Sequence, residues 1–484
     1  MDSDKSLPAN RLPSLLLFVT VAWAPFPFGS TDPSATSLWC IVLGLALVLA
    51  RPVGLQRGQL WLLALAAVVV AAYAIVLHEQ IVARPWFSIS SPHPLWQQSS
   101  KLLGTVLPPA VTIAQDQPWL AFGPPLSMML TLVCAFIVSL ERERADQLLK
   151  VVAWSGVAYA AFGIASYIGD PTKVLWRDKQ AYTTSLTATF TNRNTAAVYF
   201  GACTLIWQLM VFERIERLLP QGGADLSGLW RRILFARSRK MAVALSMFIL
   251  CLAAMLLTGS RAGVVFSLAV MIIAPVLFFR QRWPRKGGAA VVVVAGIGLA
   301  LVLLETLGSG VSSRFDIDQL ADGGRWEIYR STLRMITDYP WLGTGFGTFV
   351  WSFPAYRSET IPIVGIWDRA HNTLLELTSE AGIPLAALIV LAWVVALAML
   401  VRGVRRRRRD VVFPLSGLLI ALLALAHSSI DFSLQIPGFA IMVAAVVGCG
   451  LAQSFRSVKA PGKVSGISGE RASRRNPAKS ELAK

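Results

Sequence analysis

The chain has 484 residues, of which 55% are hydrophobic and 15% are charged, with a net charge of +18 and a mean hydropathy of +0.58. A soluble globular protein carries nearer ~25% charged residues, so this composition excludes an ordinary soluble domain. No polar stretch interleaves basic with aromatic residues. The charge therefore excludes nucleic acid as the expected partner and fits the basic loops of a membrane protein.

Apolar runs recur along nearly the whole chain. A membrane span needs ~20 mostly apolar residues, and backbone groups in lipid must find partners within the segment, so these runs predict helices. No run alternates as a barrel strand does. The sequence therefore predicts an all-α polytopic membrane protein with about twelve transmembrane helices. The predicted spans are Leu12–Phe28, Ser34–Ala50, Leu60–Leu77, Gly123–Leu140, Val151–Ile168, Thr195–Phe212, Met241–Leu257, Ala262–Phe279, Ala289–Leu304, Ile383–Val401, Val411–Leu425 and Ile436–Leu451.

Neither the start of the chain nor the cysteines predict a cleaved signal, a metal site or a disulfide framework. Met1 to Arg11 is short and polar and precedes an apolar run without a convincing cleavage site, which indicates a first span and not a removed signal. The five cysteines lie apart in apolar segments and are expected to be small buried residues, neither metal ligands nor a disulfide framework. They are Cys40, Cys134, Cys203, Cys251 and Cys449.

The basic residues define a topology. Most Lys and Arg lie in alternate connections, at 51–57, 142–150, 214–240, 280–286 and 402–409, and in the tail from 456 onward. Because Lys and Arg collect in cytoplasmic loops, both termini are predicted to be cytoplasmic. Residues 1–454 then form one transmembrane domain, and residues 455–484 form a disordered basic tail. The Arg405–Arg409 run is expected to anchor the topology near anionic lipid headgroups.

Three long connections fall on the predicted outer face, at 78–122, 169–194 and 306–382. In the largest, Asp322 is expected to cap a helix that begins at Gly323 or Gly324 and ends before Pro340. Residues at helical spacing predict an apolar face on this helix, so it is expected to lie on the bilayer or over a membrane cavity. They are Trp326, Tyr329, Leu333 and Ile336. A turn is predicted after it, at Gly343, Gly345 and Gly347.

Three arginines and a histidine gather on the same predicted face. Arg193 begins the sixth span, Arg261 occupies the tight turn between the seventh and eighth, Arg325 opens the loop helix, and His371 precedes the tenth span. A charge between two apolar helices is costly and usually marks a site or a pathway. Two structural alternatives remain, because Arg261 can extend toward headgroups, and Asn192 and Asn194 can simply cap the sixth span.

The residue types suit transfer from an anionic donor. Histidine accepts a proton near neutral pH, so His371, flanked by Asp368 and Glu376, suits a general base acting on a hydroxyl, although a lone histidine is often structural. Guanidinium groups bind phosphate oxygens bidentately and stabilise the charge that develops on a pyrophosphate leaving group. Asp316 and Asp318 are the nearest thing to a carboxylate pair and are expected to be solvated loop charges. The site is therefore predicted to need no metal and no cofactor.

At these residues the sequence resembles the O-antigen ligase and polymerase superfamily. The motifs that carry the resemblance are Phe190-Thr191-Asn192-Arg193-Asn194, Leu257-Thr258-Gly259-Ser260-Arg261-Ala262-Gly263, Gly324-Arg325-Trp326, Pro340-Trp341-Leu342-Gly343-Thr344-Gly345-Phe346-Gly347 and Ala370-His371-Asn372-Thr373-Leu374-Leu375-Glu376 with Glu380-Ala381-Gly382-Ile383-Pro384. The resemblance is clearest from about Phe190 to Leu400. Spans one to five agree only in general character.

The resemblance implies an inverting glycosyltransferase of the bacterial inner membrane with its site on the periplasmic face. The donor would be a glycan on undecaprenyl pyrophosphate, and the acceptor would be lipid A-core in a ligase or another lipid-linked glycan in a polymerase. It further implies that His371 activates the acceptor hydroxyl and that Arg193 and Arg261 hold the pyrophosphate, Arg261 with a direct part in catalysis. Arg325, Asn192 and Asn372 would help to bind substrate.

Several functions remain open from the sequence. The ligase reading is slightly favoured, followed by an O-antigen or exopolysaccharide polymerase and then by a protein O-oligosaccharyltransferase. A transporter of polysaccharide would fit the number of spans, but secondary transporters often show repeated halves and a charged pathway at mid-membrane, and neither is visible here. A membrane scaffold would leave Arg193, Arg261 and His371 as unrelated features.

Overall fold

A computed structural model describes residues 10–455, apart from 53, 88, 219–238, 282–289, 291–292, 300–301, 303–314 and 362–366. Within these residues the chain is a helical bundle, and its one sheet is the two-residue pair β1 (Lys173–Val174) and β2 (Arg177–Asp178). The predicted basic tail from 456 onward lies outside the described residues. At Asp316 and Asp318, which are expected to be solvated loop charges, only the backbone is described. The all-α membrane architecture agrees with the sequence prediction.

Seven of the described helices are long and apolar enough to cross a membrane. They are α3 (Arg57–Ile81), the continuous stretch of α5 (Gln117–Ala121) and α6 (Gly123–Val138), α7 (Arg142–Gly169), α8 (Arg193–Leu218), α10 (Arg239–Leu257), α11 (Arg261–Phe278) and α15 (Thr373–Arg406). Four shorter apolar helices complete the bundle: α1 (Arg11–Trp23), α2 (Pro33–Leu49), α16 (Val412–Ser428) and α17 (Pro437–Ala452). The predicted span Ala289–Leu304 lies partly outside the described residues, so the count of twelve stays a prediction.

Helix α8 lies in the centre of the bundle, with 89% of its most apolar stretch buried. It packs on α7, α10, α11 and α16. Small residues allow this close approach, as they do between membrane helices generally. A Cβ on Gly201 would lie 2.0 Å from the Ser267 Oγ of α11, and a Cβ on Gly156 of α7 would lie 2.4 Å from the Cys203 Sγ of α8. This packing fixes the starts of α8 and α11 next to each other.

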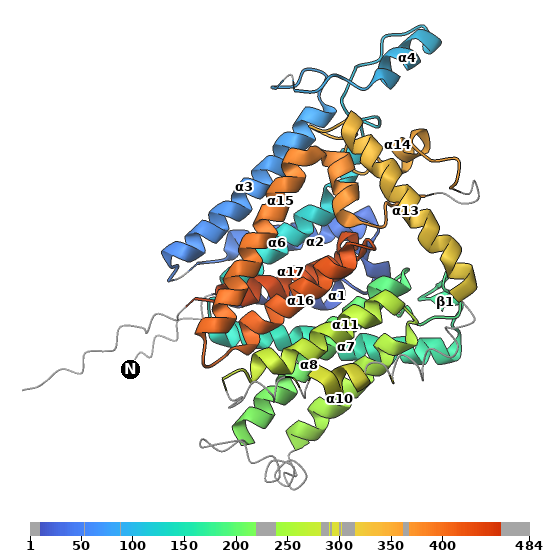
Figure 1. Ribbon diagram of the computed structural model, residues 1–484. Helices are drawn as coiled ribbons and strands as arrows, with labels where there is room; N and C mark the ends of the chain where they lie inside the picture. Colours follow the sequence, from blue (N-terminus) through green and yellow to red (C-terminus); the bar gives the residue numbers. More distant parts are fainter. Residues whose placement is uncertain are drawn as a thin grey trace, which may run out of the picture.

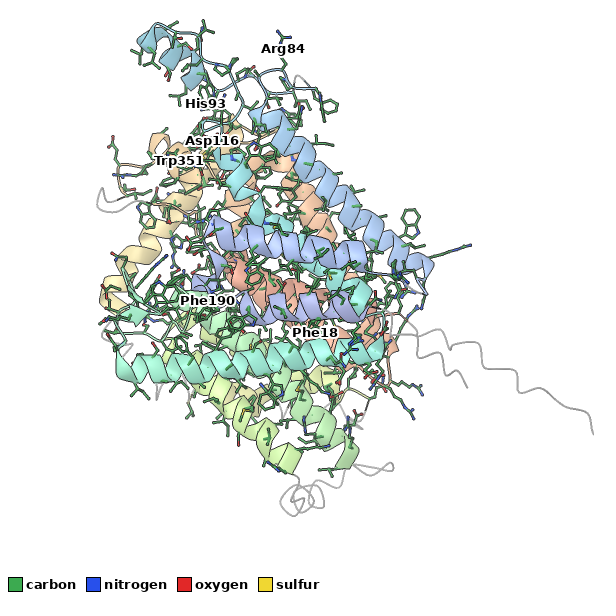
Figure 2. The ribbon with its side chains drawn as sticks, turned by 180° about the vertical axis from the view of Figure 1, so that it is seen from behind. Phe18, Arg84, His93, Asp116, Phe190 and Trp351 are labelled. Carbon is green, nitrogen blue, oxygen red and sulfur yellow. The ribbon has the colours of Figure 1, made fainter. Side chains whose placement is uncertain are left out.

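One end of the bundle carries the first residues of α8, α11 and α15, and we call it the site end. Helix α13 (Phe315–Asp338) crosses this end roughly at right angles to the spans, and does not run beside them (Figure 1). Helix α4 (Pro94–Leu103) projects beyond it on an arm that begins near Arg84 (Figure 2). The short α14 (Phe349–Ser352) follows α13.

One prediction about α13 is wrong, because the helix begins at Phe315, so that Asp322 lies within it and does not cap it. The predicted apolar face is divided between two sides of the helix, since Ile336 is buried together with Ile328 and Met335, whereas Trp326 is 60% and Leu333 is 50% exposed. Ile328 and Met335 are two turns apart and face the bundle, and the exposed pair projects on the opposite side of the helix. The predicted end before Pro340 is confirmed.

A glycine turn after α13 is fixed to a break in α15. Gly343, Gly345 and Gly347 all adopt positive φ, as the sequence predicts for a turn. Helix α15 is interrupted at Gly382, where φ is 83° and ψ is 167°. Across the break, the Ile383 amide donates to the Pro340 carbonyl at 2.7 Å, and the Gly345 amide donates to the Glu380 carbonyl at 3.1 Å. The break therefore supplies partners for the turn.

Gln80 of α3 completes this junction. Its Nε2 donates to the carbonyls of Leu342 at 2.7 Å and Glu380 at 2.8 Å, and its Oε1 accepts from the Phe346 amide at 3.0 Å. The side chain is fully buried. Buried backbone groups that leave regular structure need such partners, so Gln80 ties three chain segments together just beside the site end.

Candidate active site

Two of the predicted arginine motifs meet through one asparagine. Asn194, in the first turn of α8, accepts a hydrogen bond from the Ser260 Oγ at 2.8 Å. Its Nδ2 donates to the Asp431 Oδ2, in the turn between α16 and α17, at 2.5 Å. Arg193 directly precedes Asn194, and Arg261 directly follows Ser260. The structure thus joins segments that are far apart in the sequence, and Asn194 connects them instead of capping α8.

Both arginines stand at the start of a helix. Arg193 is the first residue of α8 and Arg261 the first of α11. Ser260 caps α11 by accepting from the Gly263 amide at 3.3 Å, and Asn192 accepts from the Asn194 amide at 2.7 Å. A helix N-terminus carries partial positive charge, and an arginine in its first turn adds a full charge. The pair of helix starts is therefore suited to bind an anion such as phosphate.

The segment that precedes α8 is buried and contacts the Arg193 side chain. Residues Ser185 to Phe190 are buried, and Phe190 lies inside the molecule against Tyr199 at 5.3 Å between ring centroids (Figure 2). The Arg193 guanidinium lies 4.9 Å from the centroid of the Tyr182 ring. Its Nη1 donates to the Ser185 Oγ at 3.5 Å. These contacts hold the guanidinium against the segment that precedes α8.

His371 sits in a constrained loop just before α15. Its φ of 52° is unusual for a residue with a side chain. The Tyr329 hydroxyl of α13 donates to its carbonyl at 3.0 Å, and its ring lies edge-on to Phe432 at 5.3 Å and to Trp367 at 6.0 Å. Its Nδ1 is buried and has no hydrogen-bond partner among the described residues. A strained backbone with an unpartnered imidazole nitrogen is typical of a functional residue.

Neighbouring polar groups hold this loop in place. The buried Glu376 carboxylate accepts from the Ala370 amide at 2.7 Å and from the Arg369 Nη1 at 3.0 Å. Asn372 caps α15 by accepting from the amides of Leu374 and Leu375, both at 3.1 Å. Its Nδ2 donates to the Ser429 carbonyl at 2.9 Å. These bonds give Asn372 a structural role, and its predicted contact with substrate stays a prediction.

The surroundings of His371 favour the neutral form of its imidazole. Burial lowers the pKa of His371 below its usual value, and the positive charges of Arg325 and Arg369 lower it further. The carboxylates of Asp431 and Asp368 act in the opposite direction. Because the net pKa is lowered, the imidazole is a free base near neutral pH and can accept a proton. Arg325 of α13 is therefore electrostatically close to His371, as the sequence predicts for one shared face.

Asp431 is the main residue that the sequence prediction missed. It is 2% exposed, and besides Asn194 it accepts from the Phe432 amide at 2.7 Å with its side chain and from the Thr373 hydroxyl at 3.3 Å with its backbone carbonyl. It therefore lies between the Asn194 network and the His371 loop. Asp431 could have been identified from the sequence, because it is a lone charge in a short turn between two apolar helices. The same argument identified Arg261.

His427, at the end of α16, has a structural position. It is fully buried, and its Nδ1 lies 3.1 Å from the Ser433 Oγ. Ser433 in turn lies 3.2 Å from the Thr195 hydroxyl of α8. His427 thus supports the turn that carries Asp431.

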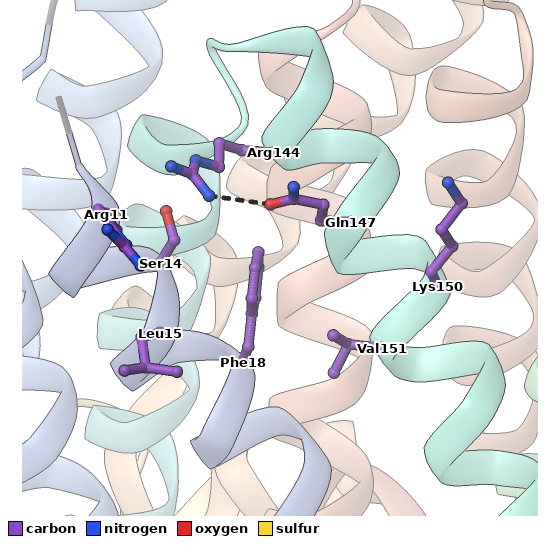
Figure 3. A pocket seen from close by; sticks show the side chains of 8 residues that line it. All are labelled: Arg11, Ser14, Leu15, Phe18, Arg144, Gln147, Lys150 and Val151. Carbon is purple, nitrogen blue, oxygen red and sulfur yellow. Dashed lines mark hydrogen bonds between the residues drawn. The ribbon is translucent and has the colours of Figure 1, made fainter. Parts of the chain in front are cut away.

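A cavity of about 430 Å³ lies at the other end of the bundle, between the first residues of α1 and α7 (Figure 3). Polar side chains lie at one level of it and apolar side chains below them. The lining residues are Arg11, Ser14, Arg144, Gln147, Lys150, Leu15, Phe18 and Val151. Arg144 donates to the Gln147 Oε1 at 2.9 Å. Because α7 separates this cavity from the segment that leads into Arg193, it is not part of the candidate site.

Among the described residues, no three His, Cys, Asp or Glu side chains are grouped as metal ligands. This observation reaches only part of the chain, and metal independence stays a prediction.

The comparison with protein families agrees with the motifs. Residues 246–390 match the family described as O-antigen ligase. The match includes Arg261, Arg325 and His371, while Arg193, Asn194 and Asp431 lie outside it and are brought to it by the fold. A search of curated proteins found no match. The match over residues 246–390 supports the resemblance to the O-antigen ligase and polymerase superfamily that the motifs indicate, and it suggests a membrane enzyme of the glycosyltransferase kind.

Proposed function

We propose that this protein is an inverting glycosyltransferase that moves a glycan from undecaprenyl pyrophosphate to an acceptor hydroxyl on the periplasmic face of the bacterial inner membrane. The observation that supports this most is the junction of Asn194, Ser260 and Asp431, which joins two arginine-bearing helix starts to the turn beside His371. The buried Nδ1 of His371 has no hydrogen-bond partner among the described residues. A proton acceptor beside anion-binding groups is what transfer from a pyrophosphate donor requires.

The reaction follows from these roles. The imidazole of His371 takes the proton of the acceptor hydroxyl, and the oxygen attacks the anomeric carbon from the side opposite the pyrophosphate. The new glycosidic bond forms as the bond to the leaving oxygen breaks, and that electron pair goes to the pyrophosphate. Arg193, Arg261 and Arg325 stabilise the charge that develops there. The protonated imidazole then returns its proton to water. No step requires an additional reactant.

Asp431 acts on this reaction through other groups. Its carboxylate raises the pKa of His371 against the lowering by burial and by Arg325. It also receives the Asn194 amide, which fixes the start of α8. We therefore assign it as a positioning residue that holds the base and the anion-binding arginines in one geometry.

A complementation experiment tests the proposal and separates ligase from polymerase. A strain that lacks this protein would receive either wild type or His371→Ala, and surface polysaccharide and lipid-linked glycan would both be profiled. We expect His371→Ala to reach the membrane at the wild-type level without restoring the polysaccharide. Accumulation of long lipid-linked chains would support lipid A-core as the acceptor, as in a ligase, and accumulation of single repeats would support a polymerase. Full complementation by His371→Ala would refute the proposed base.

The pH dependence gives a second test with a defined sign. Arg325 lowers and Asp431 raises the pKa of His371. Arg325→Gln is therefore expected to raise this pKa and move the acidic limb of the kcat/KM profile to higher pH, whereas Asp431→Asn is expected to move it to lower pH. Transfer would be measured with purified protein from about pH 5 to pH 9. If the acidic limb moved in the same direction in Arg325→Gln and in Asp431→Asn, the assignment of His371 as the titrating base would be contradicted.

A further inference from the structure

Helix α13 presents three different faces at the site end. Ile328, Ser331 and Met335 are buried against the bundle. Tyr329 lies on a flank and donates to the His371 carbonyl, and Arg325, one turn earlier on the same flank, acts on the His371 charge. The third face, opposite the buried one, carries Trp326, Arg330 and Leu333. The helix thus connects the candidate active site to an exposed surface within a single turn.

The exposed face carries two large apolar side chains beside a charged one. Trp326 is 60% and Leu333 is 50% exposed. Since α13 crosses over the ends of the spans (Figure 1), the face turned away from the bundle also points away from the ends of the spans. What distinguishes these two exposed side chains is their place next to the candidate active site. The face is continuous with the active site, because the Trp326 and Tyr329 rings meet edge to face at 6.4 Å.

Charged side chains lie beside the tryptophan ring. The Arg330 guanidinium lies 5.9 Å from the Trp326 ring centroid, and its Nη1 is bonded to the Glu327 Oε1 at 2.9 Å. An open indole face with hydrogen-bonding groups at its edge is suited to a pyranose ring. The C–H groups on one face of the sugar meet the negative π face of the indole, while its equatorial hydroxyls reach the guanidinium and the carboxylate.

We propose that Trp326, with Arg330 and Glu327, forms a sugar-stacking subsite for the glycan of the lipid-linked substrate. The inference rests on the proposed function, which places the anomeric carbon between His371 and the arginines. A glycan that leaves this point toward the outside passes Tyr329 and reaches Trp326. The subsite holds a sugar close to the reacting one, so it sets affinity for the glycan and takes no part in bond making.

Direct binding tests the subsite without relying on turnover. The probe is the reducing oligosaccharide that mild acid releases from the lipid-linked glycan accumulated by the deletion strain. Binding to the full-length purified protein, carrying His371→Ala, would be measured by calorimetry. We expect Trp326→Ala to weaken binding by about 5- to 10-fold, the range for loss of one aromatic contact, and Trp326→Tyr to restore most of it. Trp351, which is 50% exposed on α14, supplies the matched control as Trp351→Ala.

The transfer assay provides the second measurement. With His371 intact, Trp326→Ala is expected to raise KM for the donor by the same 5- to 10-fold and to change kcat by less than about 2-fold, because the loss falls on binding. Unchanged oligosaccharide binding in Trp326→Ala would overturn the subsite, as would an equal loss in Trp351→Ala. The exposure of Trp326 has a competing explanation, which is contact with lipid headgroups. If nitroxide-labelled headgroups quenched the tryptophan fluorescence of the wild-type protein more than that of Trp326→Tyr, this contact would be established and the proposal would be overturned.

The two proposals fail separately. If His371→Ala retained transfer, the proposed mechanism would fall, while the binding loss in Trp326→Ala would still establish the subsite. If transfer depended on His371 and Trp326→Ala bound the oligosaccharide normally, only the subsite would fall.

Discussion

His371→Asn is expected to lower glycan transfer by about 10²- to 10⁴-fold, the usual contribution of a general base. Asparagine is chosen because it tolerates the left-handed backbone, and His371 has a φ of 52°. The loop should therefore keep its shape, with the Tyr329 hydroxyl still donating to the carbonyl of residue 371. Initial rates with purified protein and lipid-linked donor would measure the loss, and kcat should fall more than KM changes.

A control and a rescue make this result specific. His93 stacks on Tyr339 at 5.3 Å between ring centroids, away from the arginine motifs, and His93→Ala should retain transfer within about 3-fold because it has no part in the proton transfer. Added imidazole should restore part of the activity of His371→Asn by supplying the missing base. Transfer by His371→Asn at the wild-type rate, with an unchanged acidic limb, would show that the base lies elsewhere.

Gly382→Ala is expected to lower the stability of the fold strongly. The φ of 83° and ψ of 167° at Gly382 belong to a region open essentially only to glycine. A Cβ there would lie 2.0 Å from the Trp341 carbonyl oxygen. Strain of about 1–3 kcal/mol and overpacking of about 1–3 kcal/mol together predict a loss of roughly 2–6 kcal/mol. The clash falls on backbone, which cannot move aside as a side chain can.

The loss would be measured as the temperature of half-aggregation in detergent and as the amount of protein in the membrane. Gly44 of α2 is the matched control, because a Cβ there meets nothing within 4 Å and its φ is ordinary. Gly44→Ala should leave the protein as stable or slightly more so, since alanine favours helix by up to about 1 kcal/mol. If Gly382→Ala is as stable as Gly44→Ala, the junction of Gln80, the glycine turn and the α15 break does not hold the site end together.

The sequence by itself determined the membrane class, most of the helices and the residues of interest. Spans such as α3 and α10 follow from apolar length alone, because lipid leaves a backbone no partner except its own helix. Arg261 was identified because a charge is costly between apolar helices, and the glycine turn at Gly343, Gly345 and Gly347 because glycine adopts positive φ without strain. These inferences depend on local chemistry, which neighbouring residues along the chain already specify.

The tertiary structure decided how those residues meet. The face of α13 could not be read from spacing, since Trp326 and Leu333 show the same periodicity as a buried stripe but lie opposite Ile328 and Met335. Nothing in the sequence connects Asn194 with Asp431, which are 237 residues apart and joined by a hydrogen bond of 2.5 Å. Such contacts depend on which helix starts the packing brings together. Here the small residues of α8 decide that, because they let α7 and α11 approach closely enough for the site to form.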